Sequence, residues 1–282
     1  MDQLNLMAWE GRVECLSGVV TEDQAMRMHA TLGTEDQAAP RNGDTLPALW
    51  HWGAFVPTVG MSDLGPDGHP ALGDFLPPIR LRRRMWAGGE LTFHTPLYVG
   101  EPLLRSTAIR SITEKQGRSG AMVFLTLDHE IHGQNGLAIS ERQDIVYLDI
   151  PDRYIAPKKQ AVPAVTCLSE TVEISEALLF RYSALTFNAH RIHYDRTYSS
   201  VVEHYPGLVV HGPLQATYLI DAATRYNGRA PSQFRFRGVH PMFDGSDLLV
   251  LGQSHGPEVL ALCTGSPNGH QGMQATAIWG DV

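Results

Sequence analysis

Apolar side chains recur at helical spacing in the segment that follows Ser175. Ser175 is a good N-cap residue, and Glu176 places an acid in the first turn, where the helix dipole favours negative charge. The apolar residues at this spacing are Leu178, Leu179, Tyr182 and Leu185. The pattern predicts a helix that ends near Phe187.

A second helix is predicted from residue 212 onward, because Pro213 suits the first helical position and Gly228 can end the element. Leu214, Tyr218 and Ala222 form an apolar stripe between these two residues. The segment contains few charges, so we expect the helix to be buried.

Three polar side chains follow the first helix: Asn188, His190 and His193. Because the helix ends before them, they lie on an irregular turn, where Asn188 and His193 can converge on one small volume. Imidazole is the acid and base that works near neutral pH, and an amide can hold a water or a substrate oxygen beside it. The simpler interpretation is a capped helix end followed by surface histidines.

Gly212, at the start of the second helix, favours a functional interpretation. Without a side chain, it leaves the N–H groups of the first turn unshielded, which makes a ready site for an oxygen that gains negative charge. Together, His193 and the Gly212 helix start supply the two parts needed to add water to an α,β-unsaturated thioester. One is a base for the water, and the other is a set of donors for the thioester oxygen.

At these residues the chain resembles the MaoC-like, (R)-specific enoyl-CoA hydratase and dehydratase family. The family pattern is Ser-Gly-Asp-x-Asn-Pro-x-His, followed further on by His-Gly at the start of a long central helix. Residues 186–193 keep the final histidine of this pattern as His193. Residues 210–212 keep the second element as His211 and Gly212.

Two positions depart from the family pattern. Asn188 stands where those hydratases have the catalytic aspartate, and His190 stands where they have the asparagine. An amide does not take up a proton near pH 7, so we assign the general base to His193. The chain is more similar to the branch that contains the mitochondrial-type 3-hydroxyacyl-thioester dehydratases and the mesaconyl-C4-CoA and itaconyl-CoA hydratases. For that branch we expect Asn188 to position the water, and His190 to be either a second acid/base or an orienting group.

An internal repeat links the two halves of the chain. Residues 96–104 and 241–249 share the pattern Pro-[Leu/Met]-[Tyr/Phe]-x-Gly-x-x-Leu-Leu. Each copy follows a short aromatic run, at 91–93 and at 234–236, and each precedes segments that alternate like strands. The predicted strands are 121–130 and 144–148 in the first half and 259–264 and 274–279 in the second.

Each half also has matching helical segments upstream of these strands. A capped helix begins at Thr21, as another begins at Ser175. Residues 47–55, which include Leu49, Trp50 and Trp52, stand where the Pro213 helix stands in the second half. Each half is therefore predicted to contain a helix, a long buried helix and then a run of antiparallel strands.

With the family resemblance, this order implies an α+β double hot-dog fold, in which a curved antiparallel sheet wraps a long helix twice. The predicted units are an N-terminal hot-dog domain at 1–150, a linker at 151–165 that is rich in Pro, Lys and Ala, and a C-terminal hot-dog domain at 166–282. The polar motif occurs in the second half alone. We therefore expect one active site per chain, with the first half as scaffold and as a wall of the substrate tunnel.

Composition narrows the class of protein. A net charge of −8 argues against a nucleic acid partner. No apolar run approaches the roughly 20 residues of a membrane span, and residues 1–6 lack the basic and apolar regions of a signal peptide. Cys15, Cys167 and Cys263 are widely spaced and fit a reducing compartment. We expect a cytoplasmic enzyme that does not associate with membranes.

Neither a metal nor a cofactor is expected. His29, His51 and His69 in the first half show no ligand spacing, and we predict that they are scattered. The chain has no Gly-rich phosphate loop and no Gly-x-Ser-x-Gly elbow, so nucleotide-dependent chemistry and serine hydrolysis are not supported.

A basic cluster precedes Trp86, and it is either a solvated face or an anion site. An anion site would suit the phosphates of coenzyme A, the acidic surface of an acyl carrier or a carboxylate on the acyl chain, all of which match the guanidinium fork. The expected substrate-binding residues are Arg82, Arg83, Arg84, Trp86, Arg191 and His211. If Arg191 reaches inward, the substrate is a dicarboxylic thioester.

The predicted function is the reversible hydration of an α,β-unsaturated acyl-CoA thioester. The favoured substrate is a short branched dicarboxylic thioester, itaconyl-CoA or mesaconyl-C4-CoA, on the basis of the resemblance and the arginines. Three alternatives stay open: a fatty-acid-type dehydratase that acts on acyl carrier protein, a thioesterase, and a non-catalytic acyl-CoA-binding protein. A homodimer is expected from the resemblance alone.

Overall fold

The computed structural model describes residues 5–33, 37–117 and 120–280. Residues 1–4, on which the expectation about a signal peptide partly rests, lie outside this range. Within the described residues, no helix combines the length and the apolar character that crossing a membrane would require.

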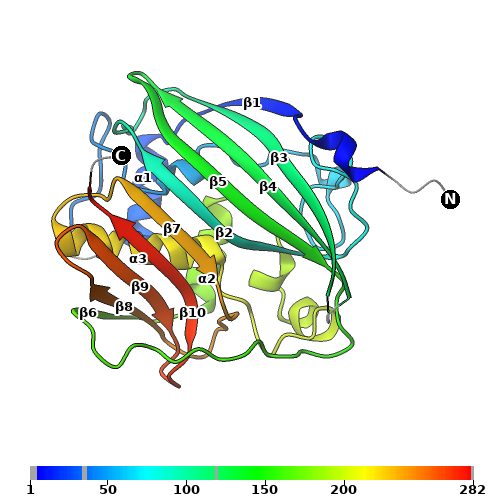
Figure 1. Ribbon diagram of the computed structural model, residues 1–282. Coiled ribbons are helices and arrows are strands. Elements are labelled where there is room, and N and C mark those ends of the chain that lie inside the picture. The colour runs from blue at the N-terminus through cyan, green and yellow to red at the C-terminus, as the bar shows by residue number, and fades with distance from the viewer. Residues whose placement is uncertain (1–4, 34–36, 118–119, 281–282) are drawn as a thin grey trace.

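The described strands form one 10-stranded antiparallel sheet in the order β1-β3-β4-β5-β2-β7-β10-β9-β8-β6. In the first half they are β1 (Val13–Gly18), β2 (Arg83–Phe93), β3 (Leu103–Gly117), β4 (Gly120–Gly133) and β5 (Gly136–Leu148). In the second half they are β6 (Leu168–Val172), β7 (Gln233–Gly238), β8 (Leu248–Ser254), β9 (Val259–Gly265) and β10 (Gln271–Ile278). Figure 1 shows the sheet curving over the helices, which lie together on one of its sides.

The strand order is symmetric about the middle of the sheet. Read outward from the centre, β2-β5-β4-β3-β1 corresponds to β7-β10-β9-β8-β6. The two halves join where β2 pairs with β7, between Gly88–Thr92 and Gln233–Arg237. The predicted double hot-dog architecture is therefore present, and β2 and β7 form a seam between the halves.

The internal repeat is confirmed as a structural repeat. Each copy connects the seam strand of its half to the next strand in sequence, β2 to β3 and β7 to β8. The shared glycines, Gly100 and Gly245, have backbone φ angles of 84° and 79°. Glycine adopts this left-handed conformation without the steric cost that a Cβ would bring, which explains why both turns contain it.

The capped helices are also confirmed. Helix α1 (Glu22–Leu32) is capped by Thr21, whose hydroxyl accepts the Gln24 N–H at 3.2 Å. Helix α2 (Glu176–Leu185) is capped by Ser175, and it ends two residues before Phe187. Helix α3 (Gly212–Asn227) has Pro213 in its first turn and ends at Gly228, whose φ is 78°.

The long buried helix expected at residues 47–55 is wrong. This segment forms a 3-10 turn at Trp50–Gly53, preceded by Leu49 in the left-handed conformation with φ 67°. Two prolines, Pro47 and Pro57, bound the segment and leave little room for a stable helix.

Side chains from β5 hold the turn in place. The Glu141 carboxylate accepts the Trp52 indole N–H at 3.0 Å and lies 3.1 Å from His51 Nε2. Burial alone would raise the pKa of Glu141, but these hydrogen bonds and the His51 charge outweigh it and lower that pKa. His51, which we expected to be a scattered residue, is therefore part of a buried structural pair.

The largest hydrophobic core crosses the seam. Leu91 of β2 and Phe234 of β7 have no exposed surface, and neither do Leu214 and Leu219 of α3. Residues 149–167 connect β5 to β6, and the predicted linker 151–165 lies within this connection. Helix α3 packs on β7, β8, β9 and β10 of the second half, and its start at Gly212 lies next to the Trp86 carbonyl of β2, so a site there is within reach of residues from both halves.

Candidate active site

The polar motif lies on an irregular turn after α2, as predicted. Phe187 adopts a positive φ of 50°, which turns the chain, and a 3-10 turn at Arg191–His193 follows. The side-chain oxygen of Asn188 accepts the His190 N–H at 3.0 Å. Asn188 therefore stabilises the turn, and its amide nitrogen is the group that is left for a ligand or water.

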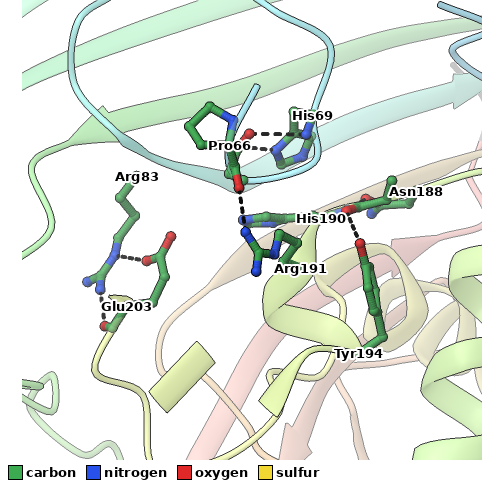
Figure 2. A network of polar contacts seen from close by, with 10 residues as sticks. Pro66, His69, Arg83, Asn188, His190, Arg191, Tyr194 and Glu203 are labelled. Carbon is green, nitrogen blue, oxygen red and sulfur yellow. Dashed lines mark hydrogen bonds and ion pairs between the residues drawn. The ribbon is translucent and has the colours of Figure 1, made fainter. Parts of the chain in front are cut away.

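Four imidazoles form a row from the first half of the chain into the second. The ring centroids of His69 and His190 lie 4.2 Å apart, those of His190 and His193 lie 5.3 Å apart, and those of His193 and His211 lie 3.6 Å apart. Figure 2 shows His69 on a loop of the first half, next to His190. The row brings the motif histidines His190 and His193 together with His211, and it adds His69 to them.

His193 has the geometry of a general base. Its Nδ1 lies 2.7 Å from the Val209 carbonyl oxygen, which only accepts hydrogen bonds, so Nδ1 carries the proton and Nε2 keeps its lone pair. Burial lowers the pKa of His193 to about 4. The imidazole is therefore neutral at pH 7 and free to accept a proton.

His211 supports His193. It is completely buried, its Nε2 lies 2.8 Å from the Ser183 hydroxyl, and its ring stacks on His193 at an interplanar angle of 18°. We expected His211 to bind substrate. The structure places it behind His193 instead, where it fixes the plane of the base.

The start of α3 is open in front of Gly212. A Cβ at this position would meet only the Met273 methyl carbon and the Trp86 carbonyl oxygen, each at 3.9 Å. Trp86 borders a bulge in β2, and its indole N–H donates to the Gly88 carbonyl at 2.9 Å. The Trp86 ring packs on Trp52 at 4.9 Å, so the indole itself belongs to the core at the seam.

A loop of the first half supplies His69, the imidazole at one end of the row of histidines. In the loop at residues 65–70, the Asp67 carboxylate lies 2.9 Å from His69 Nδ1 and also accepts the His69 backbone N–H at 3.1 Å. The Arg191 backbone N–H donates to the Asp67 carbonyl at 2.9 Å, which fixes the loop to the motif. The prediction that His69 is a scattered residue is therefore wrong.

Gly68 explains how this loop comes so close to the motif. Its φ is 91°, and a Cβ there would lie 1.9 Å from the Ala189 carbonyl oxygen. Any larger residue would force the loop and the motif apart. The sequence offered one signal, the turn-forming run Pro66-Asp-Gly-His-Pro70, which predicts a tight loop but not its neighbour.

Three residues at this contact could hold a metal ion. Asp67, His69 and His190 each offer one ligand atom, and these atoms lie within 4.8 Å of one another. Among the residues that the structure describes, this group combines one carboxylate with two imidazoles. Such donors suit several divalent transition metals.

Two of the predicted substrate-binding arginines pair with acidic side chains of the chain itself, Arg83 in a buried pair and Arg191 in a half-exposed one. The Arg83 Nε donates to Glu203 at 2.7 Å in a buried ion pair, and its guanidinium lies 4.6 Å from the Tyr205 ring centroid. Arg191 pairs with Asp195 at 2.8 Å, and its Nη1 donates to the Pro66 carbonyl at 3.1 Å. Arg83 is therefore unavailable to a ligand, and the Arg191 guanidinium is held by Asp195 and the Pro66 carbonyl.

The other two arginines, Arg82 and Arg84, line a cavity of about 350 Å³. Asp67, His69 and Tyr198 contribute to the same wall. The volume lies within the range of small-molecule pockets. A larger hollow of about 530 Å³ lies over β2, β4, β5, β7 and β10, and none of the four histidines lines it.

The buried histidines predict that acid destabilises the fold. Burial lowers the pKa values of His190, His193 and His211 below the ordinary 6.5, so the unfolded chain binds protons that the folded chain does not. Stability should therefore fall as pH drops from about 6.5 towards 4, and His193 alone should contribute a loss of about 2 kcal/mol between pH 7 and pH 5. Urea unfolding at the two pH values measures this difference.

Two matched variants test whether His193 contributes to the loss of stability between pH 7 and pH 5. His193→Gln removes the buried titrating ring, so its loss of stability between pH 7 and pH 5 should be smaller than that of the wild type. His255→Gln removes an exposed histidine and should leave the difference unchanged. Equal losses in the wild type and His193→Gln would contradict the assignment.

Together, a double hot-dog sheet and a neutral buried imidazole beside an open helix start define a hydro-lyase of thioesters. The chain belongs to the hydroxyacyl-thioester dehydratase type 2 family, whose model matches residues 49–244. The MaoC-like resemblance inferred from the motif is confirmed.

The chain is similar to characterised relatives over most of its length. It is 42% identical to a mesaconyl-C(4)-CoA hydratase of Chloroflexus aurantiacus, over 99% of this chain and 100% of that protein. It is 30% identical to the mitochondrial hydroxyacyl-thioester dehydratase type 2 of Schizosaccharomyces pombe, over 71% of this chain and 75% of that protein.

Solved structures share the fold at low identity. A MaoC-like dehydratase matches with a TM-score of 0.72 and 13% identity, over 97% of this chain and 99% of that chain. A Mycobacterium tuberculosis protein described as a double hotdog fold matches with a TM-score of 0.61 and 14% identity, over 95% and 96% of the two chains. These likenesses confirm the double hot-dog fold.

Proposed function

We propose that the protein hydrates a short, branched, dicarboxylic enoyl-CoA thioester, mesaconyl-C4-CoA or itaconyl-CoA, in a reversible reaction. The observation that carries the proposal is the cavity lined by Arg82 and Arg84, which also reaches His69, the first imidazole of the row. Guanidinium groups bind a carboxylate through charge-assisted hydrogen bonds, so this cavity suits an acyl group that ends in one. The 42% identity to a mesaconyl-C(4)-CoA hydratase supports the same substrate class.

In the hydration direction, the Gly212 N–H at the start of α3 binds the thioester oxygen and polarises the double bond. The Nε2 of His193 removes a proton from a water held by the Asn188 amide, and the water oxygen bonds to the β-carbon. The electron pair of the double bond moves towards the thioester oxygen as an enolate. The His193 imidazolium then returns the proton to the α-carbon, which restores the neutral base.

The substrate test compares thioesters with and without a terminal carboxylate. Purified protein is incubated with mesaconyl-C4-CoA, itaconyl-CoA and crotonyl-CoA while the loss of enoyl-thioester absorbance is followed, and products are identified by mass as the gain of one water. We expect the dicarboxylic thioesters to have the higher kcat/KM. Turnover of crotonyl-CoA that equals theirs would refute the proposed substrate class, and release of free thiol would indicate a thioesterase.

Arg84→Met tests the carboxylate contact directly. Loss of a hydrogen bond to a charged group costs about 1.5–3 kcal/mol, so kcat/KM for the dicarboxylic thioesters should fall about 10- to 100-fold. Crotonyl-CoA has no carboxylate at that end, and its kcat/KM should change little. Arg110→Met removes an exposed arginine on β3 that pairs with Asp128, and it serves as the control. An equal loss for all three thioesters would point to a general role of Arg84 instead.

We also propose that the protein is cytoplasmic and forms a homodimer. Cys15, Cys167 and Cys263 are all free thiols, which fits the cytoplasm and a role in degrading a dicarboxylic acid such as itaconate. A homodimer is expected by analogy with other hot-dog proteins. Light scattering measured against the 31.1 kDa of one chain decides the assembly.

A further inference from the structure

The contact between His69 and His190 joins the two halves of the molecule at the site. The His190 side chain is buried with 4% of its surface exposed, and its Nε2 has no hydrogen-bond partner. A buried N–H or lone pair without a partner is costly, so the site should supply one when it is occupied. The His69 ring, 4.2 Å away between centroids, is the polar group next to it (Figure 2).

Asp67 determines which nitrogen His69 presents to His190. The carboxylate lies 2.9 Å from His69 Nδ1 and accepts the backbone N–H of the same residue at 3.1 Å. The carboxylate therefore already acts as an acceptor toward His69 through the backbone N–H, and its second oxygen faces Nδ1. An ionised carboxylate only accepts hydrogen bonds, so His69 Nδ1 carries a proton and its Nε2 is an acceptor.

We propose that Asp67 and His69 are positioning residues that fix the tautomer of His190 in the hydration reaction. In this arrangement His69 Nε2 accepts the Nε2–H of His190, directly after a small shift or through one water, since one nitrogen of each ring and an Asp67 oxygen lie within 4.8 Å of one another. His190 Nδ1 then keeps its lone pair. This inference rests on the proposed function, because it assigns a task to His190 within that mechanism.

In this tautomer, His190 Nδ1 can accept a hydrogen bond next to the base, His193. The attacking water gives one hydrogen to His193 Nε2, which takes it as a proton, and its other hydrogen is held by His190 Nδ1. That second hydrogen stays on oxygen and ends in the product hydroxyl group, so His190 gains no net proton. Holding the water at two points aligns its oxygen with the β-carbon, which lowers the entropic cost of the attack. His190 is then the orienting group, and His193 alone carries the proton.

Nuclear magnetic resonance reads the tautomer without turnover. In the full chain labelled with ¹⁵N-histidine, long-range ¹H–¹⁵N spectra distinguish a protonated Nε2 from a protonated Nδ1, and His190→Gln identifies the His190 signals. We expect the Nε2–H tautomer in the wild type. Asp67→Asn offers His69 Nδ1 a neutral amide in place of the carboxylate, so the Nε2–H population of His190 should fall. Predominantly Nδ1–H His190 in the wild type would overturn the proposal.

Kinetics test whether the tautomer matters for the reaction. Asp67→Asn and His69→Gln should each lower kcat about 10- to 100-fold, with little change in KM. Asp63→Asn changes an exposed acid just before the same loop and should retain wild-type kinetics. Unchanged kcat in Asp67→Asn and His69→Gln would overturn the proposal. So would wild-type activity that is lost on chelation and restored by a divalent cation, because the three residues would then be metal ligands.

These outcomes are distinguishable from failure of the proposed function. If His193→Ala retains full activity, the mechanism built on His193 fails, while the His190 spectra still decide whether Asp67 and His69 set its tautomer. If His193→Ala is inactive and Asp67→Asn is fully active, the proposed function stands and the positioning role is refuted.

Discussion

Replacing His193 by alanine is expected to lower kcat for enoyl-thioester hydration about 10²- to 10⁴-fold. The Val209 carbonyl fixes the proton on Nδ1, and burial keeps the ring neutral, so Nε2 is prepared to accept a proton from water. Alanine removes the proton acceptor and leaves the helix start at Gly212 in place. The thioester should therefore still bind, and KM should change much less than kcat. Steady-state kinetics on the preferred dicarboxylic thioester measures both constants.

His193→Gln and His255→Ala complete this experiment. Glutamine keeps most of the volume of the ring but does not take up a proton near pH 7, so His193→Gln should be as inactive as the alanine variant. His255 is exposed after β8, and His255→Ala should keep wild-type activity. Substantial turnover by His193→Gln would mean that another residue is the base, with His190 the first candidate.

Replacing Glu203 by alanine is expected to destabilise the protein by about 3–5 kcal/mol. The variant leaves the Arg83 guanidinium buried without its carboxylate, since the two side chains are 8% and 1% exposed in the wild type. A charge removed from water without a partner costs several kcal/mol, which is much more than the intact pair contributes. Urea or thermal unfolding at pH 7 measures the loss of stability.

Two further variants test whether the loss of stability comes from the buried Arg83 charge that is left without a partner. Asp23→Ala breaks the exposed Arg27–Asp23 pair on α1, which is 69% and 63% exposed, and should cost no more than about 0.5 kcal/mol. The double variant Arg83→Met with Glu203→Leu removes both buried charges, so it should recover much of the stability lost in Glu203→Ala. A loss below about 1 kcal/mol in Glu203→Ala would contradict an uncompensated buried charge.

The sequence predicted the features that short-range rules determine. The caps at Thr21 and Ser175, the start and end of α3, and the glycine turns of the internal repeat all depend on a few neighbouring residues. The repeat then gave the symmetric fold, because two equal units in one chain pair their sheets. The motif gave His193 because a histidine after a helix end is recognisable in the family pattern.

Contacts between distant segments could not be predicted in this way. The loop at 65–70 meets the motif only because β2 pairs with β7 and Gly68 permits a close approach, and neither event leaves a periodic signal. The same applies to Arg83 and Arg191, since the sequence does not show which arginines have an acidic partner in space. The helix predicted at 47–55 was wrong for a different reason. Symmetry with the second half suggested a helix there, but the prolines of the segment and its contacts with Glu141 favour a short turn.

The 3-10 turn at Trp50–Gly53 stands in the first half where the second half has α3, and this difference has an evolutionary consequence. In a homodimer of single hot-dog subunits, one gene segment encodes both copies, so every substitution enters both. A change that replaced the helix by a short turn would then remove the oxyanion donors from each subunit and abolish activity. In a fused chain the two copies mutate independently. One copy can therefore lose the helix and contribute a loop such as the one that carries Asp67 and His69, while the other keeps the helix, and selection can act on each copy separately.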